Sequence, residues 1–291
     1  MKFNTKTIHG GQEHDKAYGS VMPPIYQTST YAQSTPGGHK GYEYSRTYNP
    51  TRHALENAFA SIENGNYGLA FGSGLASIDA IIKLLKPGDE VVSTNDLYGG
   101  TRNFIQTEFD KFGIEYSFTH GLEPLDFSNQ IKDNTVGIYV ETPSNPLLKI
   151  IDLKSVSSIA KEKGIWTMID NTFSSPVNQN PIDHGIDIVL HSATKYLGGH
   201  SDISAGAVVS SESRIEKILN SAKNFGGNLS DYTVWLLERS MKTLLIRVKE
   251  QTNNAKILAK MLEENNNISK VYYPGLESHP SHELAKSQMN D

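Results

Sequence analysis

The sequence predicts an α/β protein with a mostly parallel sheet that is covered by helices on both faces. Short apolar runs alternate with longer helical stretches along residues 51–210, and this alternation is typical of βαβ units. Several of the apolar runs end in a group of polar residues and glycines. In such a sheet the ligand binds at the carboxyl ends of the strands, so we expect the functional residues there.

Composition excludes several classes of function. The 291 residues are 37% hydrophobic and 20% charged, with a net charge of -5, so neither nucleic acid nor a membrane is an expected partner. No stretch approaches the roughly 20 apolar residues that span a bilayer, and the N-terminus lacks the apolar region of a secretory signal. The absence of cysteine excludes disulfides, cysteine-bound metals and thiol nucleophiles. We expect a cytoplasmic protein.

Residues 1–50 are rich in glycine, proline, threonine and tyrosine and lack helical periodicity. Such an arm has little core of its own and must lie on its own domain or on a neighbouring subunit. Its segment 41–52, GYEYSRTYNPTR, contains three tyrosines and two arginines. Arg46 offers a guanidinium fork and Tyr44 a hydroxyl, which suit an anion; the alternative is a tyrosine-rich surface loop.

The first unit after the arm predicts a phosphate site. A helix over residues 53–62 precedes a strand over 67–71, a glycine turn at 72–75 and a helix over 76–85. A strand, a glycine turn and a helix in this order present backbone N–H groups to a phosphate at a helix N-terminus. The same segment is nearly a dinucleotide fingerprint, with Ser77 in place of the third glycine, so that alternative stays open.

The remaining elements continue the alternation. The expected strands are residues 90–93, 136–140, 166–169, 186–190, 205–209 and 268–273, and the expected helices are 102–112, 153–163, 282–288 and a stretch over 230–262 that breaks near Lys242 and Thr243. We expect three parts: an arm over 1–50, a large domain over 51–240, and the start of an incomplete C-terminal α/β domain over 241–291.

Lys195 follows one of these strands in the segment 187–200, DIVLHSATKYLGGH. A lysine at the end of a buried strand loses hydration, which favours a neutral amine that can form a Schiff base with a carbonyl. Ser192 and Thr194 offer hydroxyls for an anion beside it, although a strand-end lysine can also simply reach solvent. Tyr98, Asn145 and Asp170 lie at or just past other strand ends, so this layout predicts one shared crevice.

Histidines give no second site in the sequence. His191 and His200 flank the lysine segment, and we expect structural or supporting roles for them. His279 and His282 resemble a metal motif, but Pro280 lies between them and no third ligand is evident. We expect no metal site.

Taken together, the motifs SATKYLGGHSD, GSGLAS, DLYGGT, ETPSNP and YSRTYNPTR, with Asp170-Asn171-Thr172, resemble the Cys/Met metabolism (transsulfuration) family of pyridoxal-phosphate enzymes. The resemblance covers essentially the whole chain. It implies a fold-type I PLP-dependent transferase that forms a homotetramer from dimers with shared active sites. It also removes support from the dinucleotide alternative, which explains the glycine turn but not Lys195, Arg46 or Tyr98.

The resemblance also implies a role for each matching residue. Lys195 would form the Schiff base with the cofactor and move protons, Asp170 would hold the ring nitrogen protonated, and Tyr98 would stack on the ring. Asn145 would lie near the ring hydroxyl and the substrate carboxylate. The phosphate would be bound by residues of the same subunit and by two residues of the neighbouring subunit: Ser73, Gly74, Leu75, Ser192 and Thr194 from the first, and Tyr44 and Arg46 from the second.

Two departures from the family affect the substrate. Many members have arginine two residues after the threonine of the YGG segment, whereas here Arg102 follows Thr101 directly and Asn103 takes the next place. The family also continues for about another quarter of its length, and that part carries the arginine for the substrate α-carboxylate. We therefore expect a fragment or an incomplete chain, with no residue here assigned to that role.

The implied reaction is γ-elimination of cystathionine to cysteine, 2-oxobutanoate and ammonia. Glu43 and the tail segment PGLESHP favour this carbon–sulfur lyase, whereas Gly100 stands where methionine γ-lyases have cysteine. The first alternative is γ-replacement of O-succinylhomoserine or O-acetylhomoserine by cysteine, a transferase reaction. Less favoured alternatives are a homocysteine synthase and a truncated chain that binds the cofactor without catalysis.

Overall fold

A computed structural model describes residues 1–290, which form two compact units. Unit 1 comprises residues 1–84 and 190–244, and unit 2 comprises residues 85–189 and the chain from residue 245 onward. Among the described residues, hydrogen bonding orders seven strands as β1-β7-β6-β5-β4-β2-β3. The predicted α/β class with a mostly parallel sheet is thereby confirmed.

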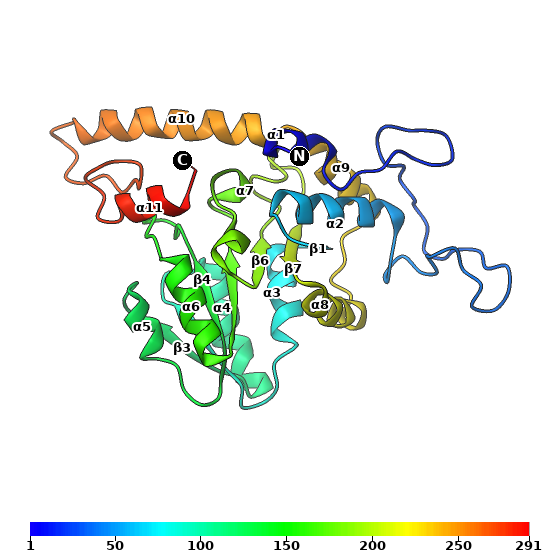
Figure 1. Cartoon of the computed structure of the whole chain (residues 1–291), viewed down its shortest axis with the longest axis horizontal. Coiled ribbons are helices and arrows are strands. Elements are labelled where there is room, and N and C mark those ends of the chain that lie inside the picture. The colour runs from blue at the N-terminus through cyan, green and yellow to red at the C-terminus, as the bar shows by residue number, and fades with distance from the viewer. Residues whose placement is uncertain (291) are drawn as a thin grey trace. The chain divides into compact units, whose positions relative to one another are not determined.

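In unit 1, helices cover an antiparallel strand pair (Figure 1). Asn49 caps α2 because its side-chain oxygen accepts from the N–H groups of Thr51 and Arg52, and α2 packs on β1, α1 and α9. Helix α3 packs on β7 and α8. The elements are α1 (Phe3–His9), α2 (Pro50–Ile62), β1 (Tyr67–Phe71), α3 (Gly74–Ile82), β7 (Gly206–Ser210), α8 (Glu212–Phe225) and α9 (Asp231–Met241).

In unit 2, four strands pair in parallel in the order β5-β4-β2-β3. The elements are β2 (Glu90–Thr94), α4 (Gly99–Glu108), β3 (Glu115–Thr119), α5 (Pro124–Ser128), β4 (Thr135–Glu141), α6 (Leu153–Lys163), β5 (Trp166–Asp170), α7 (Ser175–Asn178), α10 (Leu244–Glu263), α11 (His282–Gln288) and 3₁₀ helices at Phe109–Phe112 and Pro181–His184. Strand β6 (Ile188–His191) crosses the boundary between the units.

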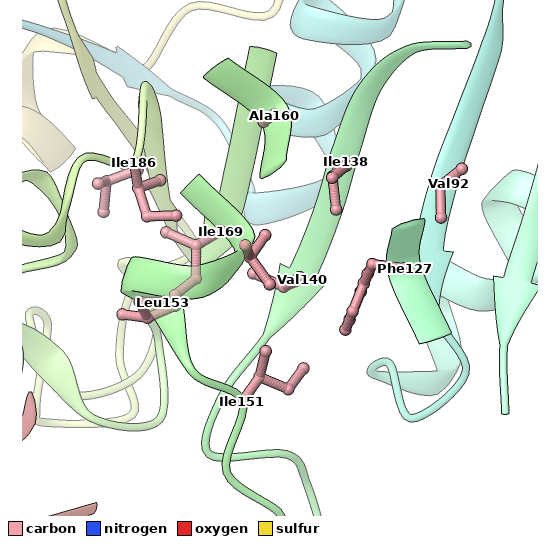
Figure 2. Close-up of a cluster of buried hydrophobic side chains, with 11 residues drawn as sticks. Val92, Phe127, Ile138, Val140, Ile151, Leu153, Ala160, Ile169 and Ile186 are labelled. Atoms are coloured by element: carbon pink, nitrogen blue, oxygen red, sulfur yellow. The ribbon is translucent and has the colours of Figure 1, made fainter. Parts of the chain in front are cut away.

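The core of unit 2 explains why its strands are apolar runs (Figure 2). Ile138 and Val140 of β4 and Ile169 of β5 are fully buried. They belong to one cluster with the apolar residues of α6, which are spaced three or four residues apart and so lie on one face of that helix. The cluster comprises Val92, Phe127, Ile138, Val140, Ile151, Leu153, Val156, Ala160, Ile169, Ile186 and Val189.

Most predicted elements are confirmed, including the break near Lys242, since α9 ends at Met241 and α10 begins at Leu244. The predicted strand over residues 268–273 is wrong, because that segment forms no strand. Its apolar residues have no neighbouring strand to complete a ladder of hydrogen bonds. Several further elements were not predicted, namely α1, α5, α7, α8, β3 and the 3₁₀ helix at Pro181–His184. The division at residues 50 and 240 stays a prediction.

The N-terminal arm is irregular from residue 10 to residue 49, as expected, apart from a bridge between Thr30 and Tyr44. Its start is tied to unit 1, where Gln12 donates to Glu238 at 2.5 Å and Lys242 donates to the Ile8 carbonyl at 2.7 Å. Its contact with a neighbouring subunit stays a prediction. Within residues 1–290, none of the helices has the length and apolar character that a membrane crossing requires.

Candidate active site

The predicted phosphate-binding turn forms the N-terminus of α3 in unit 1. Ser73 is extended, and its side chain accepts from the N–H of Ala76 at 3.1 Å. Gly74 and Leu75 come before that capped N–H, so their N–H groups precede the first intrahelical bonds. The positive end of the helix dipole favours an anion at this point.

The lysine segment lies against this turn. A Cβ atom added to Gly74 would lie 3.0 Å from the Cβ of Ser192 and 3.1 Å from its Cα, so glycine permits the close approach. At the start of β7, a Cβ on Gly206 would lie 2.2 Å from the Ser73 carbonyl oxygen. The structure therefore brings together Ser73, Gly74 and Ser192, which the sequence predicts to share a phosphate.

Lys195 lies on a loop that several hydrogen bonds hold in place. Its N–H donates to the Ser192 carbonyl at 3.0 Å, and its own carbonyl accepts from the N–H of Gly199 at 2.7 Å. The Thr194 hydroxyl accepts from the N–H of Ala205 at 3.0 Å and donates to the Ala205 carbonyl at 3.2 Å. An anion at Thr194 would have to replace that carbonyl as the acceptor of the hydroxyl.

The expected burial of Lys195 is wrong. The strand before it is buried throughout, but the Lys195 side chain is exposed. The strand ends at His191, and the three residues between it and Lys195 bring the lysine out of the core.

His191 has a structural contact, as expected. Its Nε2 atom bonds the Oε1 atom of Glu63, and both side chains are buried. Glu63 is the residue that ends α2, so the pair fixes the end of β6 to that helix. Among residues 1–290, no group of three or more histidine, aspartate or glutamate side chains is arranged to hold a metal ion.

Arg46 contacts α8 of its own unit, and Tyr44 lies beside Arg46. The Nη1 atom of Arg46 donates to the Lys223 carbonyl in the last turn of α8, and its guanidinium carbon lies 5.2 Å from the centroid of the Tyr44 ring. Both side chains remain exposed. Their predicted role at a neighbouring subunit stays a prediction.

In unit 2, two buried carboxyl groups end adjacent parallel strands. Glu141 is the last residue of β4 and Asp170 the last of β5, and the two are register partners. Register partners point to the same face of a sheet. One oxygen of Asp170 accepts from the N–H of Thr172 at 3.0 Å. Glu141 and Asp170 therefore lie side by side at the carboxyl ends of the two strands.

Glu141 also contacts the other two site residues of this unit. Its Oε2 atom accepts from the N–H of Tyr98 at 2.6 Å, and the N–H of Asn145 donates to the same carboxyl group. Burial and the negative charge of Asp170 raise the pKa of Glu141 to about 8, although these two hydrogen bonds lower it. Unit 2 thus brings together Tyr98, Asn145 and Asp170 around a buried carboxyl group whose pKa is raised.

Arg102 makes its contacts with Asn95 and Phe118 of unit 2. Its Nη1 atom donates to the Asn95 carbonyl at 2.9 Å and to the Asn95 side chain at 2.6 Å. Its guanidinium carbon lies 4.4 Å from the centroid of the Phe118 ring. These contacts occupy the Arg102 guanidinium within unit 2.

The sequence pattern of the family described as Cys/Met metabolism PLP-dependent enzyme matches residues 4–291. The chain belongs to this family. The family resemblance predicted from the motifs is therefore confirmed, and pyridoxal 5'-phosphate is the cofactor of the family. The structural comparison below agrees with the fold-type I assignment.

Relatives within the family carry different names. The chain is 48% identical over 289 residues to a cystathionine beta-lyase of Lactococcus lactis subsp. cremoris (strain MG1363), a match that covers 99% of this chain and 76% of the relative. It is 47% identical to a cystathionine gamma-lyase of Bacillus subtilis (strain 168), with the same coverage. It is 45% identical to a probable cystathionine gamma-synthase of Herpetosiphon aurantiacus, of which it covers 90%.

A solved structure of the family has the same fold. Cystathionine gamma-lyase from Lactobacillus plantarum, complexed with L-serine, matches with a TM-score of 0.97 and 42% identity. The match covers 100% of this chain and 76% of that chain. The chain thus spans about three quarters of the length of this structure and of the first two relatives.

The side chains present fit the cofactor of the family. Unit 1 offers a helix N-terminus and the Ser73 hydroxyl for a phosphate, with the Lys195 amine for an aldehyde. Unit 2 offers the buried carboxyl group of Asp170 for a protonated ring nitrogen.

Glu141 is the residue that the sequence reasoning missed. The reasoning placed it at the end of a strand, as it did Asp170, but gave it no role. The signal that was available is its position, because a carboxyl group at a strand end of a parallel sheet lies where ligands bind. Its contacts with Tyr98 and Asn145 depend on how the loops fold and cannot be read from spacing.

Proposed function

We propose that this family member cleaves cystathionine by γ-elimination, with Lys195 as the residue that binds the cofactor and moves the protons. The observation that carries the proposal is the fixed loop that carries Lys195, because Ser192 of that loop lies against the N-terminus of α3. A lysine next to an anion-binding helix end suits a cofactor that has both an aldehyde and a phosphate.

Proton transfer is the main task that falls to Lys195. When bound, pyridoxal phosphate supplies an electron sink for negative charge at the substrate carbons. The Lys195 amine would take the proton from Cα, and withdrawal of a second proton from Cβ would let the γ-substituent leave. Its backbone is fixed while its amine is exposed, which suits a base that must reach more than one atom.

The other predicted site residues would bind and orient. Ser73, Gly74, Leu75, Ser192 and Thr194 would hold the phosphate, and Asp170 would stabilise a positive charge on the ring nitrogen. Tyr98 is 51% exposed at the first turn of α4, so its ring is available for stacking. Asn145 would bind the ring hydroxyl and the substrate carboxylate.

A second candidate is β-elimination of cystathionine, which the relatives named cystathionine beta-lyase favour. It differs in needing no removal of a proton from Cβ, and it releases homocysteine, pyruvate and ammonia. The alternative γ-replacement is favoured by the relative named cystathionine gamma-synthase. The homocysteine synthase and the inactive cofactor-binding chain remain less favoured alternatives.

A product assay tests the proposed reaction. The chain loaded with pyridoxal phosphate is incubated with cystathionine, and separately with O-succinylhomoserine plus cysteine. The proposal predicts 2-oxobutanoate and cysteine from the first mixture. Pyruvate and homocysteine would establish the β-lyase instead, and cystathionine from the second mixture would establish the synthase. A chain that binds the cofactor but gives no product in either mixture would contradict the proposal.

Shared active sites give a prediction for the arm. We expect Arg46→Ala and Lys195→Ala to be inactive alone, but to regain part of the activity when mixed, because a hybrid would combine one intact Arg46 with one intact Lys195. The measurement is the lyase rate after subunit exchange, with doubly substituted Arg46→Ala/Lys195→Ala protein mixed with Lys195→Ala as the matched control. No recovery despite proven exchange would count against the shared site.

The homotetramer, built from such dimers, and the cytoplasmic location are further parts of this proposal that rest on the sequence. Sedimentation of the loaded chain tests the first of them.

A further inference from the structure

Glu141 is a buried acid that the proposed mechanism does not use. Its side chain is 6% exposed, and it lies among residues that the mechanism does use. The N–H groups of Tyr98 and Asn145 both donate to its carboxyl group, and Asp170 is its register partner. One side chain therefore connects three elements: the start of α4, the loop after β4 and the end of β5.

The charges around Glu141 favour its protonated form. Besides burial, the negative charges of Asp170 at the end of β5 and of Asp96 after β2 raise the pKa of Glu141. Burial and the charges of Asp170 and Glu141 likewise raise the pKa of Tyr139 in β4. Asp96 is itself paired with a cation, since the Nζ atom of Lys149 lies 2.6 Å from its Oδ2 atom. A second full negative charge beside Asp170 is unfavourable, which together with burial raises the pKa of Glu141 to about 8.

We propose that Glu141 is a positioning residue, which holds Tyr98 and Asn145 at the strand end of Asp170. This inference rests on the proposed function, since it concerns residues assigned to the cofactor. In its protonated form the carboxyl group would accept both N–H groups without placing a second charge beside the carboxylate that would hold the ring nitrogen.

Two substitutions separate these contributions. Glu141→Gln keeps the shape, an oxygen that accepts from the N–H groups, and the neutral charge, so it reproduces the protonated acid. Glu141→Ala removes the acceptor and leaves two buried N–H groups without it, which is costly. We expect Glu141→Gln to keep cofactor affinity and kcat at pH 7 within about 3-fold, and Glu141→Ala to lose about 10-fold or more in kcat.

The pH dependence gives a readout that a purely structural role would not move. The pKa of Glu141 is about 8 in the folded chain and near its ordinary value when unfolded. The folded state therefore holds a proton that the unfolded state loses, so stability falls as the pH rises toward and through about 8. Glu141→Gln cannot titrate. We expect the apoprotein to lose less Tm between pH 6 and pH 9 in this variant than in the parent.

Glu90→Gln is the matched control. Glu90 is also buried, but it begins β2 at the opposite end of the strands, where it accepts from Lys132 at 2.6 Å and from Ser117 at 2.6 Å. Burial opposes the charge of Glu90, but the hydrogen bonds from these partners and from Thr135 hold its pKa below the ordinary value. Glu90→Gln should lower Tm. Its cofactor affinity, and the change of its Tm between pH 6 and pH 9, should stay as in the parent.

The experiment measures pyridoxal-phosphate affinity, kcat and apoprotein Tm from pH 6 to pH 9 for the four proteins. Parent-like kcat in Glu141→Ala, or a parent-like fall of Tm in Glu141→Gln, would overturn the inference. If Glu141→Ala does not fold, the Glu141→Gln comparison still decides. Failure of the proposed function shows differently, as a parent chain that takes up no cofactor on Lys195, while the apoprotein Tm still tests Glu141.

Discussion

Replacement of Lys195 by alanine should abolish turnover while the fold remains. The side chain is exposed, and the loop is held by backbone hydrogen bonds that alanine retains, so we expect little change in Tm. The loss of a proton-transferring group alone costs on the order of 10²–10⁴-fold in rate, and the covalent attachment of the cofactor is lost as well. The measurement is product release from cystathionine at saturating cofactor.

Lys217→Ala is the control for this substitution, because Lys217 is an exposed lysine on α8 of the same unit. It should leave both the rate and the cofactor content unchanged. A Lys195→Ala protein with more than about a tenth of the parent rate would contradict the assignment, given the size of effect expected for such a group. Lys195 would then be a surface lysine at a strand end.

Asp170→Asn should slow removal of the α-proton by about 10²–10³-fold, which is the usual cost of losing one preorganised charge contact. Asparagine keeps the shape and an oxygen that can accept from the N–H of Thr172, so the strand end should stay folded. Because the ring nitrogen can lose its proton when the carboxylate is gone, the effect should appear in rate more than in cofactor binding. The measurement is exchange of the substrate α-proton with solvent deuterium.

The neighbouring carboxyl group provides the comparison for Asp170. Glu141→Gln also removes one acid from the same strand edge, but it should keep the exchange rate at pH 7 because Glu141 is already protonated there. Unchanged exchange in Asp170→Asn at saturating substrate would show that no electron-sink role depends on it. Asp170 would then be a strand-end residue that caps the turn at Thr172.

The central strands could be predicted from the sequence, but the elements at the edges of the fold could not. β4 and β5 were predictable because both contribute fully buried residues and read as apolar runs. β3 reads EYSFT and has mostly half-buried residues, so it gave no clear pattern. Residues 268–273 have strand-like composition but form no strand, because pairing depends on a partner strand and not on composition alone.

The candidate site was predictable where a strand end alone decides it. Lys195 and Asp170 follow buried runs, and Gly74 opens a helix after a strand. The exposure of Lys195 was not predictable, since it depends on the course of the loop after β6. The role proposed for Glu141 was also beyond sequence reasoning, because it follows from the register of β4 with β5 and from two loop N–H groups.

The central claim is that Lys195 carries the cofactor, and covalent trapping tests it most directly. The chain is loaded with pyridoxal phosphate, reduced with borohydride, digested and mapped by mass spectrometry. The account predicts one modified lysine, in the peptide that contains Ser192, Thr194 and Lys195. Modification of another lysine with Lys195 unmodified, or a colourless chain that takes up no pyridoxal phosphate, would contradict it.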